Sequence, residues 1–265
     1  MAAGGDQYRL RGQPTLAEPL LRESLRLTEA HFAHDRDRLI AALNALGLVC
    51  KDLAKYDEAN ACYRRALAVL EAAGETSSAN VATLYHNLGG IEHARRDYAA
   101  GESLARQGIE LRRAAAADDR TLAADMVALA AILDGLERFD EAKSLYLDAL
   151  GMLERSPSKN AHEIGVALND LGANNARRGR LDEAEALLTR ALSVKRRACG
   201  AEHPDVALSL NNLAYVYERK QAATRALELY AEALRIFERA IGPEHPKTLD
   251  CRRNYERALA LSSRM

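Results

Sequence analysis

Arginine and asparagine side chains recur in this sequence at a constant spacing. Arg177 and Arg219 are 42 residues apart, and so are Asn212 and Asn254. The planar guanidinium of an arginine matches the two oxygens of a carboxylate. The amide of an asparagine carries N–H donors and a carbonyl acceptor, so it can bond both an N–H and a C=O group of an extended peptide. These residue types therefore favour the binding of a polypeptide.

Catalysis and metal binding have little support in the sequence. His86 and His93 are seven residues apart on one helical face, but zinc normally takes three or four protein ligands, and no third ligand is nearby. His203 and His245 recur one repeat apart, and we expect them to stabilise turns between helices. P-loop, G-x-G-x-x-G, G-x-S-x-G and HExxH motifs are absent. We therefore expect no enzyme activity, no cofactor and no metal site.

The composition gives no case for a nucleic-acid or membrane partner. Of the 265 residues 28% are charged, and the formal net charge is −1. Pairs of arginines are spread along the chain and matched by acidic residues, which does not favour nucleic acid. No apolar run approaches the roughly 20 residues of a membrane helix, and residues 1–15 lack the apolar core of a signal peptide. We expect a cytoplasmic protein.

The recurring polar residues lie within a repeated pair of helical patterns. Leu210, Leu213 and Tyr217 share one helical face, and Ala226 and Tyr230 share a face of the pattern that follows. Steps of 42, 42, 41 and 42 residues back from Leu213 reach a leucine each time, and a glycine or alanine follows every one. These leucines are Leu171, Leu129, Leu88 and Leu46. A fixed period of this size predicts an array of helical hairpins.

Residues that recur at the same position of every repeat form columns, and these columns resemble those of the tetratricopeptide repeat (TPR), whose usual period is about 34 residues. The longer period here, together with the segments LNNLA, LDEAEALLTRAL and G-x-E-H-P, resembles the kinesin light chain type. The resemblance implies an all-α fold, a right-handed α-α superhelix or TPR solenoid. We expect about five full helical hairpins with a half repeat at each end, at residues 16–32 and 246–261.

The predicted domain organisation is simple. Residues 1–13 are polar and contain glycine, so we expect a disordered or short N-terminal arm there, followed by a single solenoid domain at residues 14–265. Two joints between repeats, Gly74 to Ser78 and Ser156 to Asn160, lack the G-x-E-H-P segment, and local bends are expected there. The last helix has a polar outer face, as a capping helix requires.

In TPR arrays the first helix of each hairpin lines a concave groove, so the resemblance implies that one face of each first helix meets a ligand. An α-helix rotates by about 100° per residue, and this rotation identifies the residues on the face opposite Leu213 and Tyr217. An asparagine just before the Leu-Gly/Ala pair holds peptide backbone in many family members. The candidate groove residues are Asn87, Asp170, Arg177, Leu208, Asn212, Tyr215, Arg219 and Asn254. The alternative is that Asn212 and Arg219 bond neighbouring helices and touch no ligand.

The resulting hypothesis is a non-enzymatic scaffold or adaptor that binds a peptide segment or a partner protein in the concave groove. The alternative is a structural, self-assembling protein, a homo-oligomer whose terminal half repeats stack or exchange between chains. Resemblance to kinesin light chain does not imply motor transport, because the coiled-coil heptads that would join a motor are absent.

Overall fold

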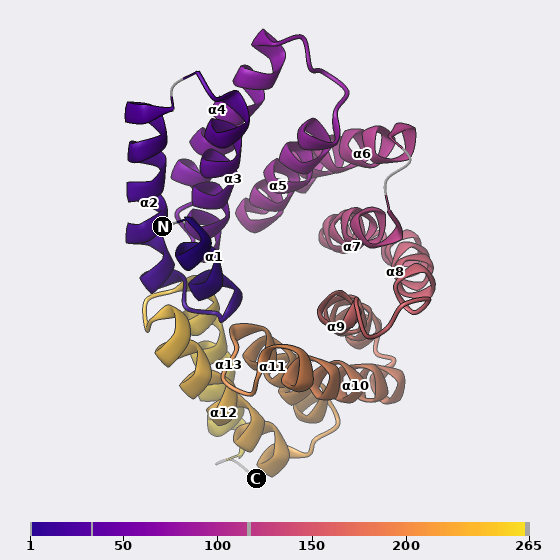
Figure 1. The fold of residues 1–265 in the computed structure, drawn as a ribbon. Helices are drawn as coiled ribbons and strands as arrows, with labels where there is room; N and C mark the ends of the chain where they lie inside the picture. The colour runs from indigo at the N-terminus through magenta and orange to yellow at the C-terminus, as the bar shows by residue number, and fades with distance from the viewer. Residues whose placement is uncertain (1, 33, 116–117, 263–265) are drawn as a thin grey trace. The chain divides into compact units, whose positions relative to one another are not determined.

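The fold consists of helices joined by short turns. A computed structural model describes residues 2–32, 34–115 and 118–262, and all regular structure in these residues is α-helical. Figure 1 labels the thirteen helices. They are α1 (Ala2–Leu10), α2 (Pro14–His31), α3 (Arg36–Asp52), α4 (Tyr56–Ala72), α5 (Ala79–Arg95), α6 (Tyr98–Ala114), α7 (Asp119–Gly135), α8 (Phe139–Leu153), α9 (Ala161–Arg177), α10 (Leu181–Cys199), α11 (Pro204–Arg219), α12 (Ala223–Ile241) and α13 (Pro246–Ser262).

The chain forms two compact units, unit 1 at residues 1–138 and unit 2 at residues 139–265. Odd-numbered helices are the first helices of the repeats, and even-numbered helices are the second helices. Within unit 1, α3 contacts both α4 and the next first helix, α5, which in turn contacts α7. Within unit 2, α9 contacts α10 and α11, and α11 contacts α12 and α13. Each unit is therefore a stack of helical hairpins.

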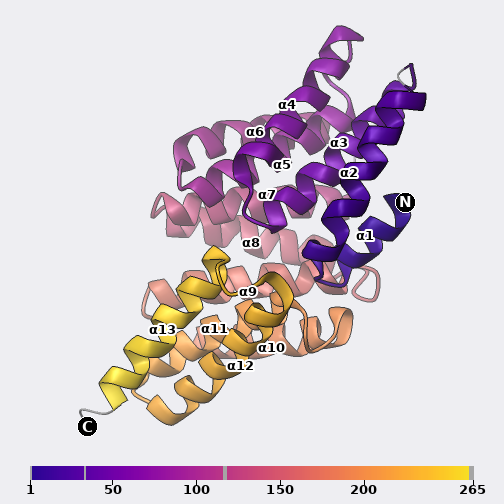
Figure 2. The ribbon, with the colours of Figure 1, turned by 90° about the vertical axis from the view of Figure 1, so that its left-hand side faces the viewer.

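The N-terminal segment differs from the prediction. Residues Ala2–Leu10 form helix α1, which lies beside α2 in both Figures 1 and 2. Gly5 is required at this contact, because a Cβ atom there would lie 2.7 Å from Cγ of Leu21. Gly5 thus allows the two helices to approach. Helix α1 pairs with α2, where the sequence analysis expected only the second helix of a half repeat. A single solenoid domain over residues 14–265 stays a prediction.

The columns found in the sequence form the cores of both units. The repeated leucines are all buried. On the second helices the repeated alanines, Ala59, Ala142, Ala184 and Ala226, are buried, and so are Tyr63, Tyr146 and Tyr230. The small residue after each leucine leaves room for the second helix. At Gly172, for example, a Cβ atom would lie 2.7 Å from Cγ of Leu188 on α10. The Leu-Gly/Ala pair therefore sets the distance between the two helices of a hairpin.

Gly172→Ala is expected to lower the free energy of unfolding by about 1–3 kcal/mol, because the added methyl group must displace Leu188. The matched control is Gly151→Ala on α8, where a Cβ atom would meet nothing within 4 Å. That change should instead raise stability by about 0.5–1 kcal/mol, since alanine is the better helix former. Urea unfolding followed by circular dichroism gives both values, and equal effects would contradict this account of the column.

Histidines cap two of the first helices, as predicted for the turns between repeats. Nδ1 of His203 accepts a hydrogen bond from the backbone N–H of Asp205 at 3.1 Å. Nδ1 of His245 accepts the equivalent bond from the backbone N–H of Lys247, also at 3.1 Å. Each bond satisfies one of the N–H groups that a helix start leaves without an intrahelical partner. The recurring G-x-E-H-P segment is thus a helix start signal.

Candidate functional site

Most of the predicted groove residues lie on the first helices of unit 2. Asp170 and Arg177 are on α9, and Asn254 is on α13. Leu208, Asn212, Tyr215 and Arg219 are on α11. We call these residues the unit 2 first-helix face. The remaining predicted residue, Asn87, is on α5 of unit 1.

The predicted asparagines bond the neighbouring first helix. Nδ2 of Asn212 donates to Oδ1 of Asn169 at 3.2 Å, and Nδ2 of Asn254 donates to Oδ1 of Asn211 at 3.1 Å. In unit 1, Nδ2 of Asn87 donates to an asparagine of α3 at 2.8 Å. These bonds match the alternative in which the amides join helices. Asn87 is only 3% exposed, and its bond joins α5 to α3.

Asn169 is the residue that the sequence analysis missed. Its side chain is 1% exposed, and Oδ1 accepts hydrogen bonds from Oγ of Ser209 at 2.9 Å and from Asn212. Its Nδ2 donates to Oδ1 of Asp170 at 2.9 Å. Burial raises the pKa of the Asp170 carboxyl. The available signal was the asparagine two residues before the leucine, which LNDL and LNNL share.

The more accessible part of the unit 2 first-helix face is basic and aromatic. Arg219 is exposed, and Nη1 donates to Oη of Tyr215 at 2.9 Å, with the guanidinium 5.8 Å from the centroid of that ring. Within the part of the chain that the structure describes, Arg219 makes no ion pair. Arg177 is also exposed, one repeat away on α9. Leu208 is half-buried against the unit 2 core and supplies an apolar contact area.

Other basic residues near the turns are already paired with carboxylates. Nζ of Lys220 lies 2.6 Å from Oδ1 of Asp182 and 2.6 Å from Oε2 of Glu185. Nη2 of Arg178 lies 2.6 Å from Oδ1 of Asp140. The acidic residues at the starts of the second helices thus bond the following repeat, which gives them a structural role. Exposed pairs of this kind contribute about 0–1 kcal/mol each.

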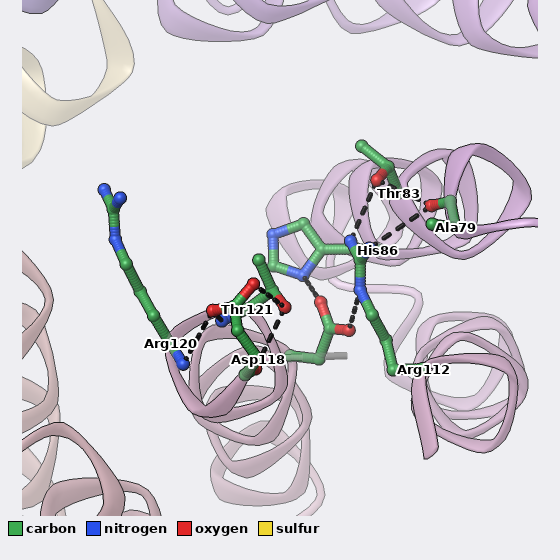
Figure 3. Close-up of polar contacts among 8 residues, drawn as sticks. Ala79, Thr83, His86, Arg112, Asp118, Arg120 and Thr121 are labelled. Atoms are coloured by element: carbon green, nitrogen blue, oxygen red, sulfur yellow. Dashed lines mark hydrogen bonds and ion pairs between the residues drawn. The ribbon is translucent and has the colours of Figure 1, made fainter. Parts of the chain in front are cut away.

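Unit 1 contains a buried charged cluster that the sequence analysis did not predict. Nε of Arg112, on α6, donates to Oδ2 of Asp125 on α7 at 2.9 Å. Figure 3 shows the same guanidinium reaching α5, where it donates to Oγ1 of Thr83 at 2.9 Å and to the carbonyl of Ala79 at 3.2 Å. Arg112 is 8% exposed and Asp125 4%. The cluster therefore joins three helices around one buried ion pair.

His86 is part of this cluster. Its Nδ1 lies 2.7 Å from Oδ1 of Asp125, and the ring stands between α5 and α7 in Figure 3. The sequence analysis considered His86 only with His93 as a metal ligand. His93 instead packs beside Tyr98, with ring centroids 5.6 Å apart. Among the described residues, no group of three or more histidine, cysteine or acidic side chains is placed to hold a metal ion.

Two clefts lie beside α3 in unit 1. One of about 340 Å³ lies between α3 and α5, and another of about 410 Å³ is bounded by α1, α2 and α3. Ala41 lines both. Phe32, which is 44% exposed, lines the larger one, and the guanidinium of Arg38 lies 4.3 Å from its ring centroid. The larger cleft has a mostly apolar lining, whereas Asp37, Asn44, Asn80 and Thr83 line the smaller one.

Unit 2 has a buried cation at the position equivalent to Arg112. Lys195 is 1% exposed, and Nζ donates to the carbonyl of Asp205 at 3.2 Å. Burial lowers the pKa of Lys195. Burial alone would raise the pKa of Asp205, but the hydrogen bond with His162 and the charge of Lys195 outweigh it and hold that pKa below its usual value. This cluster links α9, α10 and α11.

The cysteines do not have the environment of reactive thiols. Burial raises the pKa of Cys50 to about 12, that of Cys251 to about 12 and that of Cys199 to about 11. A nucleophilic or metal-binding thiol needs the opposite shift. No helix in the described ranges has both the length and the hydropathy that spanning a lipid bilayer requires.

Comparisons with known proteins agree with this architecture. One TPR family model matches residues 5–72, 163–230 and 209–265, which is more than half of the chain, and a second matches residues 81–119. No curated protein matches the sequence significantly.

Several solved structures have a similar fold. BtubC (BKLC) from P. vanneervenii is 19% identical, with a TM-score of 0.60 over 89% of this chain and 94% of that one. A Podosopora anserina protein described as a kinesin light chain with nearly identical TPR-like repeats is 17% identical, with a TM-score of 0.53 over 76% and 95%. NprR in complex with its cognate peptide NprX is 12% identical, with a TM-score of 0.70 over 94% and 67%.

These matches confirm the predicted fold class, an all-α TPR solenoid, and the predicted repeat type. The chain belongs to the tetratricopeptide repeat family, with repeats of the kinesin light chain type.

Proposed function

We propose that this protein is a non-enzymatic scaffold that binds a peptide segment or a partner protein on its first helices. The observation that carries the proposal is Arg219. The neighbouring Lys220 makes ion pairs with acidic residues, and so does Arg178, which is equivalent to Lys220 in the preceding repeat. Arg219, in contrast, is exposed beside Tyr215 and makes no ion pair within the described chain. A side chain placed in this way fits a carboxylate supplied by another molecule.

The other residues of the unit 2 first-helix face fit the same role. The bond from Asn212 to Asn169 uses one N–H of the Asn212 amide, and its carbonyl oxygen lies outside that bond. Arg177 repeats the basic position on α9, and Leu208 and Tyr215 provide apolar and aromatic area between the charges. Together these groups suit an extended segment that carries acidic side chains.

The clefts of unit 1 support the same function. They follow the exposed face of α3, where Ala41 and Ala45 leave space beside Leu27 and Phe32. Such clefts suit the side chains of a bound segment. A protein of the same fold, NprR, has been solved with its cognate peptide, which is consistent with peptide binding by this architecture. A cytoplasmic location stays a prediction.

The proposal predicts that a double variant, Arg177→Ala with Arg219→Ala, loses its partner. Because each charged hydrogen bond at such a surface is worth about 1.5–3 kcal/mol, binding should weaken at least about tenfold. Affinity capture from the native lysate, with quantification of the proteins retained, measures the loss. The control is Arg64→Ala with Arg113→Ala, which removes the same charge from exposed positions on second helices. Equal retention by both variants would contradict the proposed surface.

Self-assembly through the terminal repeats is the alternative, and the ends of the described chain favour it less. α1 completes a hairpin with α2, so a half repeat is not left open there. On α13, Nη2 of Arg252 donates to Oε1 of Glu238 at 2.8 Å, and Arg257 bonds Glu218 at 3.0 Å. These bonds make a polar cap. Light scattering that gives a concentration-dependent mass would favour the alternative instead.

A further inference from the structure

The second helix α8 is shorter than the second helices of the later repeats. Leu153, Lys195 and Phe237 are equivalent positions, each 42 residues after the one before. Helix α8 ends at Leu153, whereas α10 continues to Cys199 and α12 continues to Ile241. The chain turns away after Leu153, and Pro157 follows where another helical turn would be. One turn of helix is thus missing from the outer layer of unit 2.

The missing turn leaves a cleft of about 670 Å³. Glu154 and Pro157 bound it on one side. Ala161 and Ile164 of α9 form its floor, and Ile164 is 4% exposed. The α10 side consists of Ala186, Thr189, Arg190, Ser193, Val194 and Arg197. A volume of this size, with an apolar floor and a few polar groups at the rim, is typical of a small-molecule site.

Of the two arginines at the rim of the cleft, one is paired with a carboxylate and the other is not. Nη2 of Arg190 lies 2.5 Å from Oε1 of Glu154, which pairs these two residues. Arg197 is exposed and makes no ion pair within the described residues. The preceding residue, Arg196, is paired with Glu232 at 2.8 Å. Arg239, which is equivalent to Arg197 in the next repeat, lies 3.7 Å from a carboxylate oxygen of Glu202. The cleft therefore carries one uncompensated guanidinium above an apolar floor.

We propose that this cleft binds a small organic carboxylate with an aromatic or aliphatic body. Arg197 holds the carboxylate at the rim, and Ala161 and Ile164 at the floor contact the body together with Val194 on the α10 side. The guanidinium supplies two N–H donors for the carboxylate, and the hydroxyl groups of Thr189 and Ser193 can bond its remaining lone pairs. The site lies between the start of α9 and α10, and none of its lining residues belongs to the unit 2 first-helix face.

The test uses the full chain with methyl groups of alanine, isoleucine and valine isotopically labelled. Titration with 4-phenylbutanoate and with octanoate should shift the methyl signals of Ala161, Ile164 and Val194 in a saturable manner. An open cleft and a ligand of about twelve heavy atoms suggest a Kd on the order of 1 mM. Arg197→Ala should weaken binding at least about tenfold. The neutral analogue 4-phenylbutanamide should bind at least about tenfold more weakly than the acid.

The matched control is Arg239→Ala, which removes the equivalent arginine one repeat later and should leave the titration unchanged. Each variant is first compared with the wild type by its thermal unfolding curve, so that loss of binding is not loss of fold. Absence of saturable shifts, equal binding of the amide, or an equal effect of Arg239→Ala would overturn the proposal. Shifts at the same methyl groups that appear on raising the protein concentration without ligand would assign the cleft to a second copy and overturn it too.

Discussion

Asp125→Ala is expected to lower the free energy of unfolding by about 3–5 kcal/mol, because it leaves the guanidinium of Arg112 buried without its carboxylate. The two residues are almost fully enclosed and are joined at 2.9 Å. Urea unfolding gives the total change. Hydrogen exchange of the amides in α5, α6 and α7 should locate it, because these are the helices that the cluster joins.

A double variant separates the charge from the loss of packing. In the next repeat both equivalent positions are apolar: Leu153 corresponds to Arg112, and Ala167 corresponds to Asp125. Arg112→Leu combined with Asp125→Ala should therefore recover most of the stability that Asp125→Ala loses, since removing both charges also removes the desolvation cost. If the double variant is less stable than Asp125→Ala alone, the buried pair is not the source of the effect.

Asn169→Ala is expected to cost about 2–4 kcal/mol. The substitution removes the acceptor of Ser209 and of Asn212 and the donor to Asp170, all at the contact between α9 and α11. Each buried group left without a partner costs about 1–3 kcal/mol. Thermal and urea unfolding measure the change, and local hydrogen exchange in α9 and α11 should rise.

The matched control for Asn169 is Asn212→Ala. Asn212 is half-buried and shares a single hydrogen bond with Asn169, so its loss should cost about 1 kcal/mol or less. If Asn212→Ala destabilises as much as Asn169→Ala, the two amides share one structural role. If it leaves stability unchanged and weakens partner binding, Asn212 is available to a ligand as proposed.

The repeat period carries most of the information about the fold. The leucine column, the small residue after it and the alanines of the second helices recur because every hairpin must solve the same packing problem. Gly172 beside Leu188 shows the constraint directly, since even one methyl group does not fit there. Such columns predict the helices, the hairpins and the family from the sequence alone.

Several features that the sequence analysis missed occupy positions where one repeat differs from the others. Helix α1 has no leucine column, and its Gly5, an indication of disorder in isolation, is required by the contact with Leu21. Arg112 and Asp125 occupy positions that are apolar in most other repeats, and only the distance between them shows that they meet. The early end of α8 follows from Pro157 and its neighbours, whose effect on the surface depends on what α10 presents opposite.

The asparagines show a second limit of sequence reasoning. An amide that can bond a peptide backbone can equally bond another amide, and residue type does not distinguish the two uses. The spacing of Asn212 and Asn254 is shared by the asparagines that bond them, so periodicity does not distinguish them either. The structure adds the burial of each side chain: Asn87 and Asn169 are enclosed, whereas Asn212 and Asn254 are half-buried.

Site-specific photo-crosslinking tests the central claim, binding on the first helices, most directly. A benzophenone amino acid is placed at Tyr215 on α11 in one variant and at Leu147 on α8, which is 49% exposed, in another. On irradiation in the native lysate, the account predicts a discrete product from position 215, suppressed by excess unmodified protein, and none from position 147. A product from position 147 alone, or a product with the mass of two copies of this chain, would contradict it.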